Sequence, residues 1–164
     1  MSRTDNQTKK WYNPDTCTII EICQNPNLGT FLSCKLGIDK TSQIFLNEVS
    51  LNEAENKGFS KTEVILTFSR CFPCKIYIKQ VPTNTRIIGS QLENQFENLH
   101  RGDSSILAFS IVTSSILVTY DKDLLAVCKS AKVPHLNPND FLCVVDVPVL
   151  KHRKYGGRGD EIEY

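Results

Sequence analysis

The chain has 164 residues, 40% of them hydrophobic and 23% charged, with a formal net charge of +1. This size and composition indicate one globular domain, and the near-zero net charge excludes a global positive field that would attract nucleic acid. Residues 1–10 lack the apolar stretch of a signal peptide, and no apolar run approaches the ~20 residues of a transmembrane helix, so we expect a soluble cytoplasmic protein without membrane contact.

The first third of the chain contains signals for one strand and one helix. Residues 1–13 are polar and are expected to form an N-terminal extension. Residues 17–23 (CTIIEIC) are rich in β-branched side chains, which predicts the first strand. Leucine and phenylalanine then recur at helical spacing over 28–36, and Gly37 is expected to end that helix.

The middle of the chain contains two signatures of helix starts, then a strand and a further helix. Residues 50–53 (SLNE) and 60–63 (SKTE) both fit a capping box, in which a serine and a glutamate satisfy each other's backbone N–H groups. Residues 75–81 alternate with a period of two, which predicts a strand that ends at Pro82. An apolar stripe over 88–99 has helical spacing and predicts an amphipathic helix.

The remaining elements alternate between helix and strand. Residues 103–114 are apolar on nearly every side, which predicts a buried helix. The later elements are expected to be a strand over 115–119, a helix over 124–131, an edge strand or turn at 134–138, and a short helix or strand over 139–145. This alternation predicts an α/β fold in which a mostly parallel central sheet lies between two helical layers. We expect this domain to span 14–147, followed by a charged tail over 148–164.

Aspartates mark the ends of two of these predicted elements. Asp103 opens the buried helix, and Asp121 and Asp123 follow the strand that ends near Thr119. Strand ends and helix starts gather at one edge of an open α/β sheet, where ligands bind. Carboxylates at such an edge are suited to holding a divalent cation, and crowding of like charges should raise the pKa of at least one of them.

Two glutamates complete the candidate cluster, Glu21 inside the predicted first strand and Glu53 in an early helix. A carboxylate in the apolar run around Glu21 would be costly to bury unless it were paired or metal-bound. Simpler roles remain open for the other acids. Asp103 and Asp121 could serve only as helix N-caps, and Glu53 could serve only to complete a capping box.

The seven cysteines are spread through the predicted strands and helices, as is typical of free thiols in a cytosolic protein. Only Cys71 and Cys74 have the spacing of a metal or redox pair. Because no second pair and no histidine cluster accompanies them, a structural role is favoured over zinc or redox chemistry. We expect no structural disulfide.

The motifs of the second half resemble those of the PIN-domain nucleases. Residues 101–108 (RGDSSILA) are similar to the family's aspartate that opens a buried helix. Residues 116–124 (ILVTYDKDL) and 137–142 (NPNDFL) resemble its strand ending in Thr-x-Asp and its closing Pro-x-x-Phe-Leu. Residues 50–53 look like the family's early helix with its glutamate, so the resemblance spans roughly 17–145.

The resemblance implies a three-layer α/β/α fold and a metal-dependent ribonuclease. The catalytic and metal-binding acids that it implies are Glu21, Glu53, Asp103 and Asp121, with Asp123 and Thr119 as auxiliary residues. One or two Mg²⁺ or Mn²⁺ ions would neutralise the phosphate and activate a water for hydrolysis of the RNA backbone. Glu21 departs from the family pattern, in which the first strand ends with an aspartate followed shortly by a small hydroxyl residue or asparagine.

Basic side chains near the acids or in the tail are the expected contacts to the RNA backbone: Lys35, Arg101, Lys122, Lys151, Arg153 and Lys154. The resemblance also implies an antitoxin protein as a partner, and a homodimer. Two alternatives remain open. The departure at Glu21 is compatible with a catalytically impaired PIN-like module that binds RNA or protein. Clustered acids also occur in receiver-type phosphoacceptors, although this chain offers neither their acidic pair near the first strand nor their lysine after the last.

Overall fold

Within residues 9–141, which the computed structural model describes, five parallel strands form one sheet in the order β3-β2-β1-β4-β5. The strands are β1 (Trp11–Pro14), β2 (Gln43–Asn47), β3 (Lys75–Lys79), β4 (Ile116–Val118) and β5 (His135–Leu136). β1 lies at the centre of the sheet and pairs with β2 on one side and with β4 on the other. The sheet is parallel throughout, as the alternation of elements predicts.

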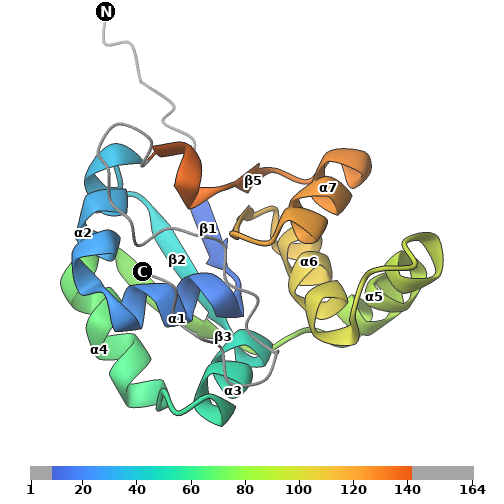
Figure 1. The fold of residues 1–164 in the computed structure, drawn as a ribbon, viewed down its shortest axis with the longest axis horizontal. Coiled ribbons are helices and arrows are strands. Elements are labelled where there is room, and N and C mark those ends of the chain that lie inside the picture. Colours follow the sequence, from blue (N-terminus) through green and yellow to red (C-terminus); the bar gives the residue numbers. More distant parts are fainter. Residues whose placement is uncertain (1–8, 142–164) are drawn as a thin grey trace, which may run out of the picture.

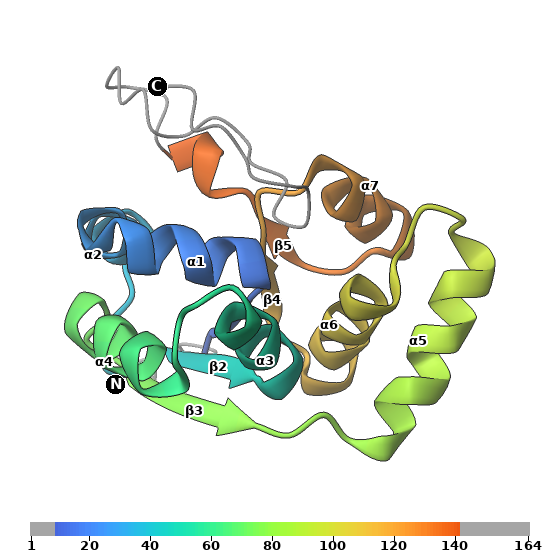
Figure 2. The ribbon, with the colours of Figure 1, turned by 60° about the horizontal axis from the view of Figure 1, so that its bottom comes forward.

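Helices cover both faces of this sheet. They are α1 (Thr16–Gln24), α2 (Pro26–Lys35), α3 (Glu48–Asn56), α4 (Lys61–Cys71), α5 (Thr83–Gln95), α6 (Arg101–Thr113) and α7 (Lys122–Ala131), with a 3₁₀ turn over Pro138–Phe141. Figure 1 shows α1, α2 and α4 to one side of the central strands, and α5, α6 and α7 to the other. The turned view in Figure 2 shows the same division, which gives the three-layer α/β/α arrangement.

Side chains of the central strands alternate between two cores on opposite faces of the sheet. Tyr12 and Val118 belong to the core that α1, α2 and α4 cover. Leu117 belongs to the second core, with residues of α5, α6 and α7. Phe45 of β2 also faces α6, where its ring lies 6.2 Å from that of Phe109. Strands that are buried on both faces are the rule in parallel sheets, because helices cover each face.

The first strand lies earlier in the chain than the sequence pattern predicts. The predicted strand over 17–23 is wrong, because these residues belong to α1. Asp15 begins this helix as its N-cap, and all three isoleucines of the helix are buried, so tertiary packing outweighs their preference for strands. The core already includes Tyr12, which lies in the segment that we expected to be an extension.

The start of α3 also differs from the prediction. The capping box over 50–53 is wrong as a helix start, because Asn47 is the N-cap and its Oδ1 accepts a hydrogen bond from the Ser50 N–H at 2.8 Å. β2, which leads into this helix, carries no strong alternation in the sequence and was not predicted. The helix start predicted at the second capping box is confirmed, because Ser60 is the N-cap of α4 and its hydroxyl accepts a hydrogen bond from the Glu63 N–H at 3.2 Å.

The other elements lie where the sequence predicts them, within a few residues. The expected strands over 75–81 and 115–119 are β3 and β4, and the buried helix is α6. The amphipathic helix ends at Gln95, before the end of its apolar stripe. The tail over 148–164 and most of the expected element over 139–145 lie outside the described residues. Among the described helices, none combines the length and the apolar character needed to cross a bilayer.

Candidate acidic site

Three acid-bearing segments begin where neighbouring parallel strands end. Asp15 directly follows β1, the helix that carries Glu53 follows β2, and Asp121 comes three residues after the end of β4. Because the strands are parallel, these segments start at the same edge of the sheet. The chain runs from β1 to β2 on one side and later returns to β4 on the other. The edge between β1 and β4 is therefore the topological switch point, where open α/β sheets bind ligands.

Asp15 is held at this edge by backbone and hydroxyl groups. Its N–H donates to the carbonyl of Val118 at 3.0 Å, which joins the ends of β1 and β4. Its Oδ1 accepts from the N–H and the hydroxyl of Thr18 at 2.9 and 2.7 Å, and its Oδ2 accepts from the Thr119 hydroxyl at 2.5 Å. Burial raises the pKa of Asp15 to about 6, although these hydrogen bonds lower it.

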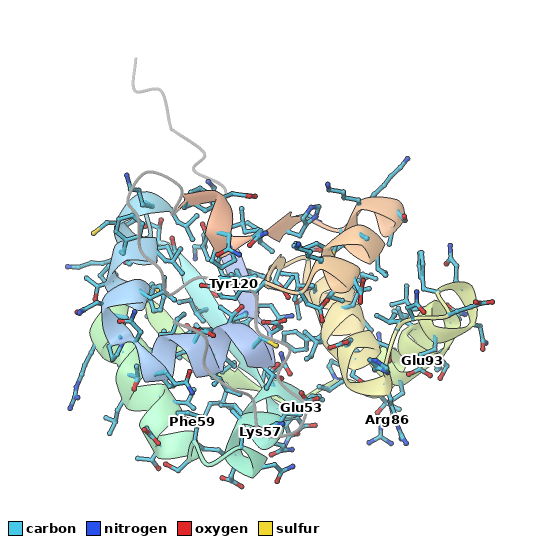
Figure 3. All side chains as sticks on the ribbon, viewed as in Figure 1. Glu53, Lys57, Phe59, Arg86, Glu93 and Tyr120 are labelled. Atoms are coloured by element: carbon cyan, nitrogen blue, oxygen red, sulfur yellow. The ribbon has the colours of Figure 1, made fainter. Side chains whose placement is uncertain are left out.

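Glu53 reaches from α3 toward the starts of α1 and α6. The Thr16 hydroxyl donates to Glu53 Oε2 at 2.7 Å. At the other oxygen, Gly102 in the first turn of α6 approaches so closely that a Cβ on this glycine would overlap Glu53 Oε1. Figure 3 labels Glu53 at α3, on the side of that helix toward α6. The carboxylate therefore lies at the N-terminal ends of two helices, where the helix dipoles stabilise negative charge.

Asp103 lies in the first turn of α6 and is the most perturbed acid of the group. Burial and then the negative charges of Asp121, Asp15 and Glu53 raise the pKa of Asp103 to about 7, while His100 lowers it. The three charges act on Asp103 from three different segments, so the four carboxylates share one electrostatic environment. Crowding of like charges was expected from the sequence, and it is present here. The alternative that Asp103 is only the N-cap of α6 is wrong, because His100 is the N-cap of this helix.

Asp121 has the structural role that the sequence left open. It is the N-cap of α7, and its Oδ1 accepts from the N–H groups of Asp123 and Leu124 at 2.9 and 3.3 Å. Its own N–H donates to the Thr119 hydroxyl at 3.0 Å. Because that hydroxyl donates in turn to Asp15, Thr119 connects two acids of the site. A cap role and a place in the cluster are therefore compatible.

Comparison with solved structures identifies the fold. VapBC2 from Rickettsia felis, bound to a DNA fragment from its promoter, matches with a TM-score of 0.60 and 15% identity over 77% of this chain and 98% of that chain. The chain has a PIN-domain fold. VapBC-1 from nontypeable Haemophilus influenzae also matches, with a TM-score of 0.60 and 10% identity over 79% of this chain and 98% of that chain. A Pyrobaculum aerophilum protein matches with a TM-score of 0.54 and 14% identity, over 82% and 95% of the two chains. No family model and no curated protein matches the chain.

In this PIN fold, Asp15 and not Glu21 occupies the position after the first strand. Glu21 lies six residues further along α1, which is about 9 Å along a helix axis. Its side chain is buried, and it is not among the charges that raise the pKa of Asp103. The prediction that Glu21 lies at the end of the first strand is therefore wrong, because residues 17–23 form a helix and not that strand.

The signal for Asp15 is present in the sequence. Asp15 is followed by Thr16 and Thr18, which is the pattern of an aspartate and nearby small hydroxyl residues that the resemblance implies for the first strand. It was missed because residues 11–14 (WYNP) are a short strand that ends in proline, a residue rare inside strands. The more strongly β-branched run that follows hid this strand.

The donor chemistry of the four acids fits a hard divalent cation, since carboxylate oxygens are the ligands that Mg²⁺ and Mn²⁺ prefer. Within the described residues, however, no group of three or more histidine, cysteine or acidic side chains is placed to hold a metal ion. The orientation of three of these carboxylates follows from their hydrogen bonds to the protein. Threonine hydroxyls bind Asp15 and Glu53, and backbone N–H groups of α7 bind Asp121, so these carboxylates are turned toward protein donors.

The predicted RNA contacts divide into two groups. Arg101 and Lys122 are the exposed first residues of α6 and α7, next to Asp103 and Asp121. Lys35 lies at the end of α2, and its Nζ stands 5.4 Å from the ring centroid of Phe31 on the same helix. The tail residues Lys151, Arg153 and Lys154 lie outside the described residues.

The cysteine pair at 71 and 74 has a packing role in the structure. Cys71 is buried, and its Sγ lies 3.3 Å from the carbonyl oxygen of Pro26. It packs so closely on Gly29 of α2 that a Cβ there would lie 2.8 Å from Cys71 Sγ. The six cysteines of the described part are free thiols, and burial raises the pKa of both Cys71 and Cys74.

Proposed function

We propose that this chain is a metal-dependent ribonuclease that hydrolyses RNA phosphodiester bonds. Its catalytic and metal-binding acids would be Asp15, Glu53, Asp103 and Asp121, with Asp15 in the place that the sequence pattern had given to Glu21. The supporting observation is that Asp103, at the switch point of a PIN fold, has a pKa raised to about 7 by burial and by the other three acids. A concentration of negative charge at this position favours a cation.

A bound Mg²⁺ or Mn²⁺ would neutralise the phosphate and lower the pKa of a bound water for attack on phosphorus. The protein positions the acids for this purpose. Thr18 and Thr119 hold Asp15, and Thr16 holds Glu53, so the carboxylates are oriented before a substrate arrives. Asp123, exposed on the first turn of α7, would act as an auxiliary acid at the rim.

Arg101 and Lys122 would contact the phosphates on either side of the scissile bond, because each lies two residues or fewer from an acid of the site. Lys35 and the tail residues Lys151, Arg153 and Lys154 would extend this contact. The matched VapBC structures support an antitoxin protein as the partner of this chain, and a homodimer is part of the same proposal.

An RNA cleavage assay tests the proposed function. The wild type, Asp15→Asn, Asp103→Asn and Glu21→Gln are incubated with a labelled single-stranded RNA in Mn²⁺, in Mg²⁺ and in chelator. We expect cleavage by the wild type only with metal, and a loss of at least 100-fold in the two aspartate variants, since each removes a metal ligand. Glu21→Gln is the matched control and should keep its activity.

The alternative is a PIN-like module that binds RNA or protein without cutting. One observation favours it: the described carboxylates are not placed to hold a metal ion. Metal-independent binding of the same RNA, without cleavage in either metal, would select this alternative. Cleavage that survives Asp15→Asn but not Glu21→Gln would instead contradict the assignment of the first acid.

A further inference from the structure

Two fully buried asparagines lie beneath the acidic site, on the face of the sheet that packs against α6. Asn13 is on β1 and Asn47 is at the end of β2, and the exposed fraction of each is 0%. The neighbours of Asn13 on the adjacent strands, Leu117 and Phe45, are apolar. A polar pair here costs free energy unless every polar atom is satisfied.

Every hydrogen-bonding group of the two side-chain amides has a partner. Asn13 Nδ2 donates to the carbonyl of Ile106 at 3.2 Å and to the hydroxyl of Ser110 at 2.9 Å, both on α6. Asn13 Oδ1 accepts from Asn47 Nδ2 at 2.8 Å. Asn47 Nδ2 also donates to the hydroxyl of Ser50 at 3.0 Å, and Asn47 Oδ1 accepts from the Ser50 N–H. The opposite orientation of the Asn13 amide would bring Nδ2 against Nδ2 and oxygen against oxygen, so the network fixes it.

This network connects the three elements that carry Asp15, Glu53 and Asp103. Asn13 is two residues before Asp15, so both project from the same side of an extended segment. Asn47 is the N-cap of α3, the helix of Glu53. On α6, Asn13 binds one turn beyond Asp103 on the same helical face, because Ile106 and Ser110 follow Asp103 by three and seven residues.

We propose that Asn13 and Asn47 form a positioning bridge that sets the spacing of the acids in the site. This inference rests on the proposed function, because it assigns the spacing to metal binding. An apolar side chain at position 13 could pack on this face, but it would let α6 shift along the sheet. A fully satisfied buried polar network instead specifies one arrangement.

Each variant removes the bridge but keeps the other hydrogen bonds of the partner residue, so only one polar atom of the amide pair loses its partner: one N–H of Asn47 Nδ2, or Asn13 Oδ1. When Asn13 is replaced by leucine, the Asn47 amide still binds Ser50, and the Ser110 hydroxyl still accepts from Ser115 at 3.3 Å. In Asn47→Ser, the serine hydroxyl can still cap α3, since serine is a good N-cap, but it is too short to reach Asn13. The two variants therefore break the same hydrogen bond from opposite sides, with different effects on packing.

Mn²⁺ affinity of the folded, full-length chain is the first readout, by titration well below the melting temperature. We expect Asn13→Leu and Asn47→Ser each to weaken binding about tenfold, as is usual when supporting hydrogen bonds of a metal site are lost. The double variant should lose little more than either single variant, because both remove one bridge. Val64→Ala, which destabilises the opposite core, is the matched control and should bind Mn²⁺ like the wild type.

Hydrogen exchange of the metal-free chain is the second readout. We expect faster exchange in α3 and in the first turns of α6 for both asparagine variants, with α2 and α4 unchanged. Wild-type affinity together with unchanged exchange in a folded variant would overturn the bridge. If Asn13→Leu does not fold, Asn47→Ser decides by the same criteria. If the wild type binds no Mn²⁺, the proposed function fails, and exchange alone still decides whether the bridge holds the elements.

Discussion

The acid whose titration reports most directly on the site is Asp103. Its pKa is raised to about 7, so between about pH 4 and pH 7 the folded protein binds a proton there that the unfolded chain releases. The contribution of this residue to the free energy of unfolding is therefore largest below pH 4 and is lost as the pH rises through 7. At pH 8 without metal, the burial of the ionised Asp103 carboxylate, and then its repulsion by the other three acids, destabilise the fold.

Asp103→Asn should reverse this effect. Asparagine cannot ionise, so we expect the metal-free variant to be more stable than the wild type by about 2 kcal/mol at pH 8, and nearly equal to it at pH 4. Urea unfolding at both pH values measures the difference. Glu55→Gln, which removes an exposed acid of α3, is the control and should change stability little at either pH. Equal stability of Asp103→Asn and the wild type at pH 8 would mean that the Asp103 carboxylate is neither penalised by burial nor crowded by the other acids.

At the residue scale, three of the four acids that the structure brings near Asp103 or places there were candidates from the sequence, and Asp15 was not. Asp103 could be singled out because it precedes the apolar run of a clear helix, and Asp121 because it follows the apolar run of a clear strand. Glu53 was a candidate because of the resemblance, and the capping box that offered it a purely structural role does not form. Its proximity to Thr16 depends on the packing of α3 against α1, which no local pattern contains. Predicting Asp15 requires recognition of the four-residue strand β1 that precedes it.

At the scale of elements, the close contact between α6 and Glu53 makes an unusual prediction for a glycine. Alanine in place of a helical glycine normally stabilises a helix by about 1 kcal/mol. Gly102→Ala should not show this gain, because its Cβ would overlap Glu53 Oε1 and displace the carboxylate from Thr16. We expect equal or lower stability and weaker Mn²⁺ binding.

Gly89→Ala on α5 is the matched control for this prediction. Its Cβ would meet the backbone and hydroxyl oxygens of Ser104 at 3.6 Å, which is an ordinary contact. This variant should gain about 0.5–1 kcal/mol with unchanged Mn²⁺ binding. Thermal melts and metal titrations of the two variants give the comparison. A similar gain from both would show that α6 does not press on Glu53.

The type of an element could be predicted where its hydrophobic pattern is long. The prediction failed where tertiary contacts decide between helix and strand. α6 and α7 have apolar residues on the faces that they bury, and β3 alternates. α1 is rich in β-branched residues, yet it is a helix because Asp15 caps it and both the sheet and α4 bury it. β2 was missed because it is buried on both faces and therefore does not alternate.

At the scale of the whole molecule, the fold class followed from the alternation of helices and strands alone. The order of strands in the sheet, which creates the switch point between β1 and β4, required the structure. Since the four acids lie between 18 and 106 residues apart in the chain, their convergence is a property of this topology. Metal binding should therefore stabilise the whole domain.

The melting temperature should rise with Mn²⁺. A cation at 100 times its dissociation constant adds about 2.7 kcal/mol to the free energy of unfolding, which corresponds to roughly 5–10 °C for a chain of this length. Differential scanning calorimetry with up to several millimolar MnCl₂ measures the shift. Asp15→Asn should abolish most of it and Glu21→Gln should not. Coincident wild-type melts with and without millimolar metal would count against the site.

The most direct test of the central claim is the position of a bound metal. Crystals of the full-length chain grown with MnCl₂ should give an anomalous difference peak at the manganese edge, within coordination distance of carboxylate oxygens of Asp15, Asp103 and Asp121. Compared with the metal-free arrangement, the Asp15 carboxylate should release at least one threonine hydroxyl. A peak coordinated by Glu21, or no peak at this edge of the sheet in millimolar Mn²⁺, would contradict the assignment of the acidic site.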